Sequence, residues 1–229
     1  MPETLEELYL RQPHLSDGKW VVTYTGTYYS ITNPLAEDVH LMDIAHALSQ
    51  VNRWTGHTTV PFSVAQHSVV CSYLVPQAFA LRALLHDAQE HILADVNRPA
   101  KSELPQYSAL EARHEAVIAQ AAGIIGPCMT PEVKAADNLA LALEYRDLFS
   151  IAAKKGPWVP DGDVSGIPPL VALGHAEAKL QFLRRYFELT GDYVLPLERR
   201  VATDAFRAGF EFAMRDFGQT ITEEAKVCN

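Results

Sequence analysis

The stretch LRALLHDAQEHILADVNRPAK, Leu81 to Lys101, contains both a core pattern and a group of ionisable residues. At 100° per residue its apolar residues fall on one stripe, which predicts a core-facing helix that runs to about Asp95 and ends at Asn97 and Pro99. The stripe consists of Leu81, Leu84, Leu85, Ala88 and Ile92. His86, Asp87 and Glu90 fall on the opposite side of the helix.

The neighbours on that second side are small and apolar, whereas a solvated face would carry Lys, Glu and Gln. These neighbours are Ala80, Ala83 and Ala94. We therefore expect this side to pack against the protein or to line a pocket. A buried imidazole and carboxylate must be paired or bound to a metal, because burying an unpaired charge is very costly. An adjacent His and Asp are, on their own, more often an ordinary surface pair. Other segments of the sequence must therefore show whether this pair has a function.

Helical patterns dominate the chain after residue 40. Ser63 with Gln66 three residues later is a capping-box pattern, and Thr130 followed by Pro131 marks another helix start. Earlier, the residues from Lys19 to Ile31 are rich in β-branched and aromatic types and predict a short hairpin. The Pro- and Gly-rich segment 156–174 predicts a loop.

These patterns predict a mostly α-helical fold with a small N-terminal β-hairpin. No linker divides the chain, so we expect one domain over residues 1–229. Its core covers about 41–150, and a C-terminal helical extension covers about 174–218.

Composition narrows the class of protein. The 229 residues are 48% hydrophobic and 21% charged, with a net charge of −9 and a pI of about 5.4, which disfavours a broad nucleic-acid surface. The N-terminus lacks signal-peptide features, and no stretch approaches the ~18 apolar residues of a membrane span. Three widely spaced cysteines form no disulfide or zinc-ribbon pattern. We therefore expect a cytoplasmic protein without a membrane partner.

Two further residues extend the ionisable group. His67 lies in the apolar helix pattern SVAQHSVVCSYL, and Asp137 lies among Ala and Leu in KAADNLALALEY. Each alone is more often a hydrogen-bonded structural residue. With His86 and Asp87 they supply two imidazoles and two carboxylates, which suit a divalent ion such as Zn, Co, Mn, Fe or Mg. This set contains no thiolate, which argues against a structural zinc site and favours open positions for water and substrate.

The arrangement of His67, His86-Asp87 and Asp137 resembles the H…HD…D pattern of the HD-domain metal-dependent phosphohydrolases, over Leu41 to about Ser150. RWTGHTTVPFSVAQHS and LLHDAQEHILADVNRPAK are similar to the branch that holds bacterial 5′-deoxynucleotidases and small phage dATP triphosphohydrolases. The resemblance implies an HD-domain helical bundle, one or more divalent metal ions, a deoxynucleotide substrate and a homo-oligomer. For a chain of phage origin, it places the protein in the host cytoplasm.

The resemblance also assigns roles to single residues. It matches Glu90 to the family's acidic residue after the HD pair, where it would orient the attacking water, accept its proton or support His86. Asp95 matches the sugar-contacting Asp. The Arg-Trp pair of the branch corresponds to Arg53 and Trp54.

The remaining substrate contacts follow from residue type. Arg53 and Lys101 could neutralise phosphate, with Arg98 a weaker candidate, and Trp54 could stack on a base. His57 could reach a phosphate, while Gly56 and Pro99 could shape the base pocket. The competing interpretations are solvated cations, core packing for Trp54 and a turn contact for Asp95.

Four functions remain open from the sequence. The leading one is hydrolysis of dATP to deoxyadenosine and triphosphate, with dADP and dAMP as further substrates. A 5′-deoxynucleotidase acting on deoxynucleoside monophosphates is the close alternative. Hydrolysis of a signalling nucleotide and a non-catalytic nucleotide-binding HD module rank lower.

Overall fold

The structure is a computed structural model that describes residues 4–201, and it is mostly helical with one small antiparallel sheet among those residues. Strands β1 (Trp20–Val22) and β2 (Tyr28–Ser30) pair with Val21 opposite Tyr29. The predicted hairpin is therefore confirmed. Its turn is held by Asp43, whose carboxylate accepts hydrogen bonds from the backbone N–H and the hydroxyl of Thr25.

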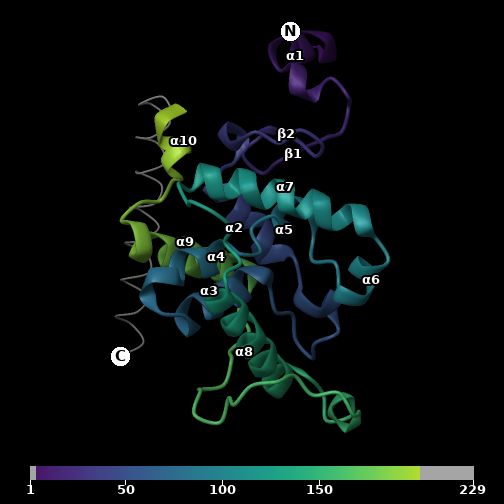
Figure 1. Cartoon of the computed structure of the whole chain (residues 1–229), viewed down its shortest axis with the longest axis vertical. Helices are drawn as coiled ribbons and strands as arrows, with labels where there is room; N and C mark the ends of the chain where they lie inside the picture. Colours follow the sequence, from purple (N-terminus) through teal and green to yellow (C-terminus); the bar gives the residue numbers. More distant parts are fainter. Residues whose placement is uncertain (1–3, 202–229) are drawn as a thin grey trace.

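The body of the molecule consists of α-helices. They are α1 (Leu5–Arg11), α2 (Leu41–Gln50), α3 (Val64–Leu74), α4 (Ala80–Leu85), α5 (Glu90–Leu93), α6 (Arg98–Ser102), α7 (Pro105–Ala121), α8 (Pro131–Leu148), α9 (His175–Thr190) and α10 (Pro196–Val201). Short 3-10 helices are η1 (Pro13–Leu15), η2 (Ala36–Asp38), η3 (Arg53–Gly56), η4 (Gln77–Phe79) and η5 (Ala153–Lys155). Helix α1 and the hairpin lie at one end of the long axis, and α8 extends towards the other end (Figure 1).

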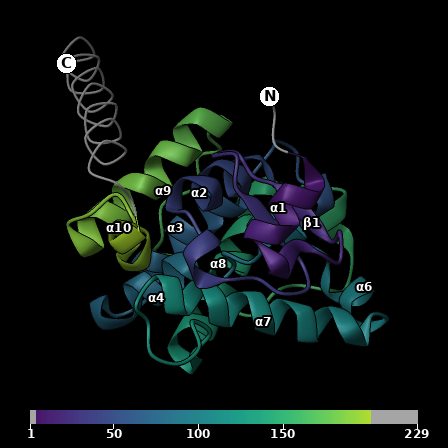
Figure 2. The ribbon, with the colours of Figure 1, turned by 90° about the horizontal axis from the view of Figure 1, so that it is seen from above.

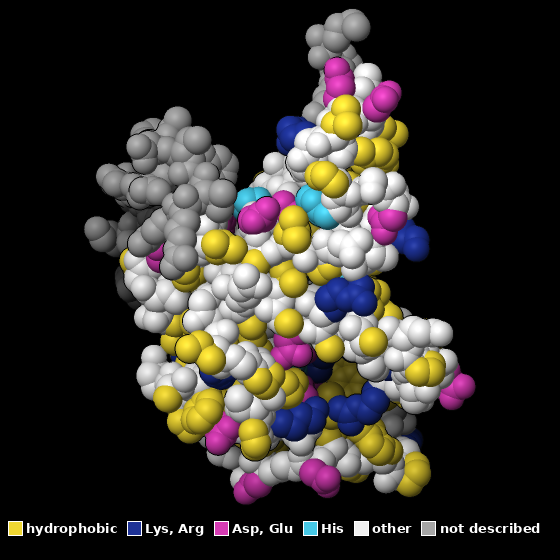
Figure 3. Space-filling view, turned by 45° about the horizontal axis from the view of Figure 1, so that its top comes forward, with side chains coloured by type: hydrophobic (Ala, Val, Ile, Leu, Met, Phe, Trp, Pro, Cys, Tyr) yellow, Lys and Arg dark blue, Asp and Glu magenta, His cyan; other side chains and the backbone are white. Residues whose placement is uncertain are grey.

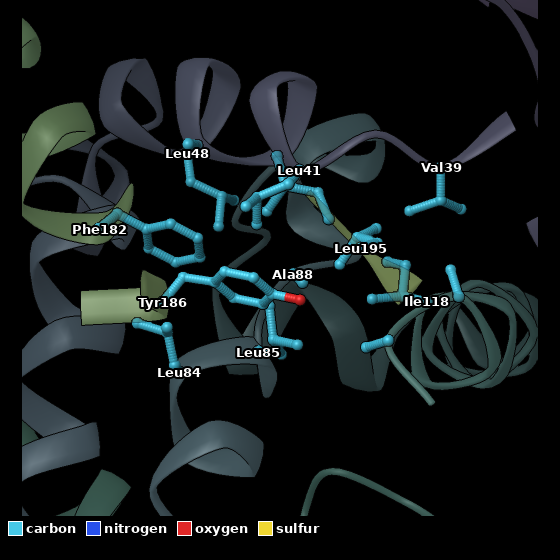
Figure 4. Close-up of a cluster of buried hydrophobic side chains, with 14 of the residues drawn as sticks. Val39, Leu41, Leu48, Leu84, Leu85, Ala88, Ile118, Phe182, Tyr186 and Leu195 are labelled. Carbon is cyan, nitrogen blue, oxygen red and sulfur yellow. The ribbon is translucent and has the colours of Figure 1, made fainter. Parts of the chain in front are cut away.

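The core forms where α9 packs on α2, α3 and α4 (Figure 2). Phe182 and Tyr186 of α9 are fully buried, with Phe182 beside Leu48 and Tyr186 beside Leu84 and Leu85 (Figure 4). The predicted apolar stripe is confirmed, since Leu84, Leu85 and Ala88 are core residues and Leu81 and Ile92 pack at the edge of the core.

The two predicted helix starts are also confirmed. The Ser63 hydroxyl accepts from the backbone N–H of Gln66, and the Thr130 hydroxyl accepts from that of Val133. The Gln66 side chain does not close the capping box. Its amide instead donates to the carbonyl of Val171 and accepts from the N–H of Leu173, and so ties α3 to the predicted loop.

The prediction of one continuous helix over residues 81–95 is wrong. Helix α4 ends at Leu85 and α5 begins at Glu90, with residues 86–89 in a turn. Here the backbone makes shorter i→i−3 bonds, from Ala88 N–H to the Leu85 carbonyl and from Glu90 N–H to the Asp87 carbonyl. An apolar 3.6-residue pattern does not reveal such tightening.

Asn97 also differs from the prediction. Its side chain accepts from the N–H of Ala100 and caps α6, with Pro99 in the first turn, so these residues begin a short helix. The segment predicted as a loop, 156–174, contains no regular helix or strand. The predicted C-terminal extension is described as α9 and α10, and its part beyond Val201 lies outside the described residues. None of the described helices is both long and apolar enough to cross a bilayer.

Candidate metal centre and adjoining pocket

Three segments distant in sequence bring the four predicted ligands together. His67 comes from α3, His86 and Asp87 from the turn between α4 and α5, and Asp137 from α8. The His67 Nε2 atom lies 3.3 Å from an Asp137 oxygen and 3.6 Å from Asp87 Oδ2, which lies 3.1 Å from His86 Nε2. These separations match those between ligands of one ion, whose bonds to nitrogen and oxygen are about 2.0–2.2 Å.

The tautomer of His86 suits metal ligation. Its Nδ1–H donates to the carbonyl of Ala83 at 2.7 Å, which leaves Nε2 with a free lone pair. That Nε2 atom is buried without a hydrogen-bond partner and faces Asp87. An orphaned buried acceptor costs free energy unless something binds it. The donor set therefore fits a divalent cation.

The charges at this centre also fit a cation. Burial alone would raise the pKa of Asp87, but His86, His67 and Arg53 lower it overall. Burial would likewise raise the pKa of Asp137, and the adjacent His67, His86 and Lys134 side chains lower it overall. Both carboxylates are thus ionised at neutral pH.

The thiol of Cys71 is a neighbour that the sequence interpretation omitted. One turn after His67 on α3, its sulfur lies 3.5 Å from His67 Nε2. Donor atoms of Cys71, His67, His86 and Asp137 all lie within 4.8 Å of one another, so this group could also hold a metal ion. Burial raises the pKa of the thiol, whereas Asp87 on the pocket side is already ionised. Asp87 and Cys71 are thus two candidates for the fourth ligand, and Asp87 is the one that lines the cavity.

Glu144 is a second residue that the sequence interpretation missed. It lies seven residues after Asp137, on the same face of α8, and is 1% exposed. One carboxylate oxygen accepts from His67 Nδ1 at 2.6 Å. The other accepts from the indole N–H of Trp54 at 2.6 Å and from Arg53 Nε at 3.4 Å.

The Arg53-Trp54 pair lies on an unusual piece of backbone. Within η3, Trp54 and Thr55 have φ values of 58° and 52°, in the left-handed region that a β-branched residue rarely adopts. Such a conformation persists only where surrounding contacts fix it, and it is typical of functional sites. Here the contacts include the bond from Trp54 to Glu144 and one from Arg53 N–H to the Phe62 carbonyl.

A cavity of about 690 Å³ adjoins the metal centre, and its volume suits a small organic ligand. The surface is hollowed here, with Lys and Arg side chains around the opening (Figure 3). Predicted site residues that line the cavity are Arg53, Trp54, His86, Asp87, Glu90, Asp95, Arg98, Pro99, Lys101 and Asp137. His67 is fully buried behind them. Gly56 and His57 are exposed and lie outside the lining, so the structure does not bring these two predicted contacts to the site.

Two acidic side chains of the cavity, Glu90 and Asp95, have raised pKa values and different neighbours. Burial and the charges of Asp87 and Asp95 raise the pKa of Glu90 well above its ordinary value. Its Oε2 atom is buried without a partner, and Oε1 lies 3.8 Å from the Lys101 ammonium. The predicted support of His86 by Glu90 is wrong, because the carbonyl of Ala83 accepts the Nδ1–H bond. Burial also raises the pKa of Asp95, which lies 3.9 Å from Arg53 Nη1.

Lys134 and Trp158 also line the cavity, and the sequence interpretation named neither. The Lys134 ammonium bonds to Asp137 at 2.6 Å, one turn earlier on α8. Trp158 comes from the irregular segment after α8 and packs edge-on against Trp54, with ring centroids 6.1 Å apart. Side chains of α8 form hydrogen bonds to this segment. Arg146 donates to the carbonyls of Val164, Ile167 and Pro168, and Asp147 accepts from the N–H of Leu170.

Two further histidines, His91 and His114, lie outside the cavity lining. His114 bonds to the Tyr29 hydroxyl and to the Ile31 carbonyl, which fixes α7 to the hairpin. His91 donates to the Ala88 carbonyl at 2.7 Å, and burial lowers its pKa to about 4. These contacts agree with structural roles.

The fold and site together define a mostly helical protein with a candidate metal centre beside a charged pocket. The chain is 37% identical to the uncharacterized protein YfdR of Escherichia coli over 174 residues, which are 75% of this chain and 96% of YfdR. The chain belongs to the same family as YfdR. It is also 34% identical to the uncharacterized protein RCAP_rcc00048 of Rhodobacter capsulatus over 144 residues, 56% of this chain and 72% of that protein. No family model matches the chain.

Proposed function

We propose that the chain is a divalent-metal-dependent phosphohydrolase of the HD-domain type and that it cleaves dATP to deoxyadenosine and triphosphate. One observation carries the proposal: the unpartnered Nε2 of His86 converges with His67, Asp87 and Asp137 beside a cavity whose lining contains four cationic and six acidic side chains. His67, His86, Asp87 and Asp137 would hold the ion. When bound, it would polarise the 5′-phosphate and acidify the attacking water.

The side chains around this centre have complementary tasks. Arg53 and Lys134, next to Asp87 and Asp137, would bind oxygens of the phosphate at the reacting bond. In the reaction, the water oxygen bonds to the α-phosphorus and the bond to the 5′-oxygen breaks. Glu90, whose pKa is raised by burial and by Asp87 and Asp95, would give its proton to the departing 5′-oxygen and would then, as a carboxylate, take up the proton released by the attacking water.

Two cations that lie beyond those next to the metal centre favour a triphosphate over a monophosphate, although the lining also contains six acidic side chains. Arg98 and Lys101 line the cavity in addition to Arg53 and Lys134, which offers charge for phosphates beyond the first. The charge of Lys101 is partly neutralised, because its ammonium bonds to Glu111 at 2.6 Å. A 5′-deoxynucleotidase acting on monophosphates is the second candidate, because the same centre and Arg53 suffice for one phosphate. A homo-oligomer remains a prediction of the family resemblance.

The base would lie against Trp54 and Trp158. We expect Trp158→Ala to raise KM for dATP about 5- to 160-fold with little change in kcat, because stacking on an aromatic ring contributes about 1–3 kcal/mol. Trp158→Phe keeps an aromatic ring and should lose much less. Trp20→Phe, on the hairpin, is the control. Steady-state kinetics measure these values, and an unchanged KM in Trp158→Ala would remove Trp158 from the base site.

The substrate assignment is tested by a panel of all deoxynucleoside tri- and monophosphates and signalling nucleotides, each with Mn, Co, Zn or Mg. We expect consumption of dATP with at least one ion and none with chelator. Turnover of monophosphates alone would establish the 5′-deoxynucleotidase instead. Inertness towards every nucleotide would favour a binding module without catalysis.

A further inference from the structure

The buried carboxylate of Glu144 connects two parts of the site that the sequence presents as separate. Its two oxygens face different partners: Oε1 accepts from His67, and Oε2 accepts from Trp54 and Arg53. We infer that Glu144 is a positioning residue that fixes His67 for metal binding and, at the same time, fixes Arg53 and Trp54 for substrate binding. This inference rests on the proposed metal and phosphate sites.

The first half of the inference follows from the tautomer of His67. A carboxylate can only accept, so the bond at 2.6 Å requires a proton on Nδ1 and leaves Nε2 of neutral His67 free for the ion. The Nε2 atom is the one that lies near Asp87 and Asp137. Partners of this kind typically change metal affinity about 10- to 100-fold when removed.

The second half follows from the backbone of η3. Trp54 is held in the left-handed region, and its indole N–H bond to Glu144 is one of the contacts that fix it. Arg53 Nε reaches the same oxygen, which turns its Nη1 towards Asp87 at 3.8 Å. Without Glu144, the guanidinium and the indole would lose their common anchor at the wall of the cavity.

Glutamine at position 144 distinguishes the two roles of Glu144, which are to fix His67 and to fix Arg53 and Trp54. Glutamine has the same shape but only one acceptor oxygen, and its NH₂ group donates. If the oxygen faces Trp54 and Arg53, the NH₂ faces His67 Nδ1 and forces the proton onto Nε2, which then cannot bind an ion. If the oxygen faces His67, the NH₂ group faces the N–H donors of Trp54 and Arg53 and cannot accept from them. Glu144→Gln must therefore impair one task, and Glu144→Leu must impair both.

The test measures two affinities of the full-length protein by calorimetry. One is for Mn²⁺, and the other is for inorganic triphosphate in metal-free buffer. We expect Glu144→Leu to weaken both about 10-fold or more and Glu144→Gln to weaken chiefly one of them. Glu198→Gln is the matched control, because Glu198 is a buried carboxylate that also contacts a histidine, His40, but lies outside the cavity. It should retain both affinities.

Unchanged affinities in Glu144→Leu, or in Glu144→Gln should the leucine variant fail to fold, would overturn the inference. So would equal losses in Glu198→Gln. Neither titration depends on turnover. A wild-type protein that shows the expected pattern but cleaves no nucleotide would refute the proposed function and leave the role of Glu144 intact.

Discussion

His86→Ala is expected to lose turnover by about a thousandfold or more, since metal-ion catalysis contributes several kcal/mol and each 1.36 kcal/mol is a factor of ten. The variant removes the unpartnered Nε2 atom that the centre offers to the ion. Calorimetry with Mn²⁺ should show a matching loss of affinity. Asp87→Ala and Asp137→Ala should behave in the same way.

His91→Ala is the matched control for this prediction. His91 is buried and donates its Nδ1–H to the carbonyl three residues earlier at 2.7 Å, as His86 does. It does not line the cavity. The two variants thus remove the same side chain and the same type of hydrogen bond, and circular dichroism should show a retained fold in both. Wild-type turnover in His86→Ala would eliminate the proposed centre.

Glu90→Gln is expected to lower kcat about 10²- to 10⁴-fold, the range for a positioned proton donor. Burial and the neighbouring carboxylates raise the pKa of Glu90, so the acid form that donates the proton persists well above the usual range. The rate of the wild-type protein should fall as the pH rises through this pKa, because the proton is lost. Glutamine does not titrate, so the variant should lack that alkaline decline.

Glu115→Gln is the control for Glu90. Its carboxylate also lines the cavity, but it accepts from the backbone N–H groups of Cys128 and Met129 and faces no other proposed catalytic group. A pH–rate profile of kcat for both variants separates their roles. If Glu90→Gln keeps the wild-type alkaline decline, the proton donor is another group.

The convergence of His67, His86, Asp87 and Asp137 could be anticipated because each interrupts an apolar helical pattern with a residue that is costly to bury alone. The same reasoning predicted the core stripe of Leu84, Leu85 and Ala88. Spacing along one segment places each residue on a helix face, while the family resemblance indicated that the three segments meet.

The features that the sequence did not reveal depend on tertiary contacts. Glu144 shares a helical face with Asp137, but its partners His67 and Trp54 come from other segments. Thr55 has a left-handed backbone conformation that a β-branched residue rarely adopts, so its surroundings must set this conformation. Trp158 lies in a segment without periodicity, and its carbonyl accepts a hydrogen bond from the Tyr145 hydroxyl of α8, which helps to hold it at the cavity.

The most direct test of the central claim is phosphorus NMR of dATP incubated with metal-loaded, full-length protein. The proposed cleavage at the 5′ ester predicts that triphosphate appears intact, with deoxyadenosine as the nucleoside product and no reaction in His86→Ala. Orthophosphate or pyrophosphate as the first product would place the cleaved bond elsewhere in the chain of phosphates. Such a result, or unchanged dATP with every divalent ion, would contradict the proposed function.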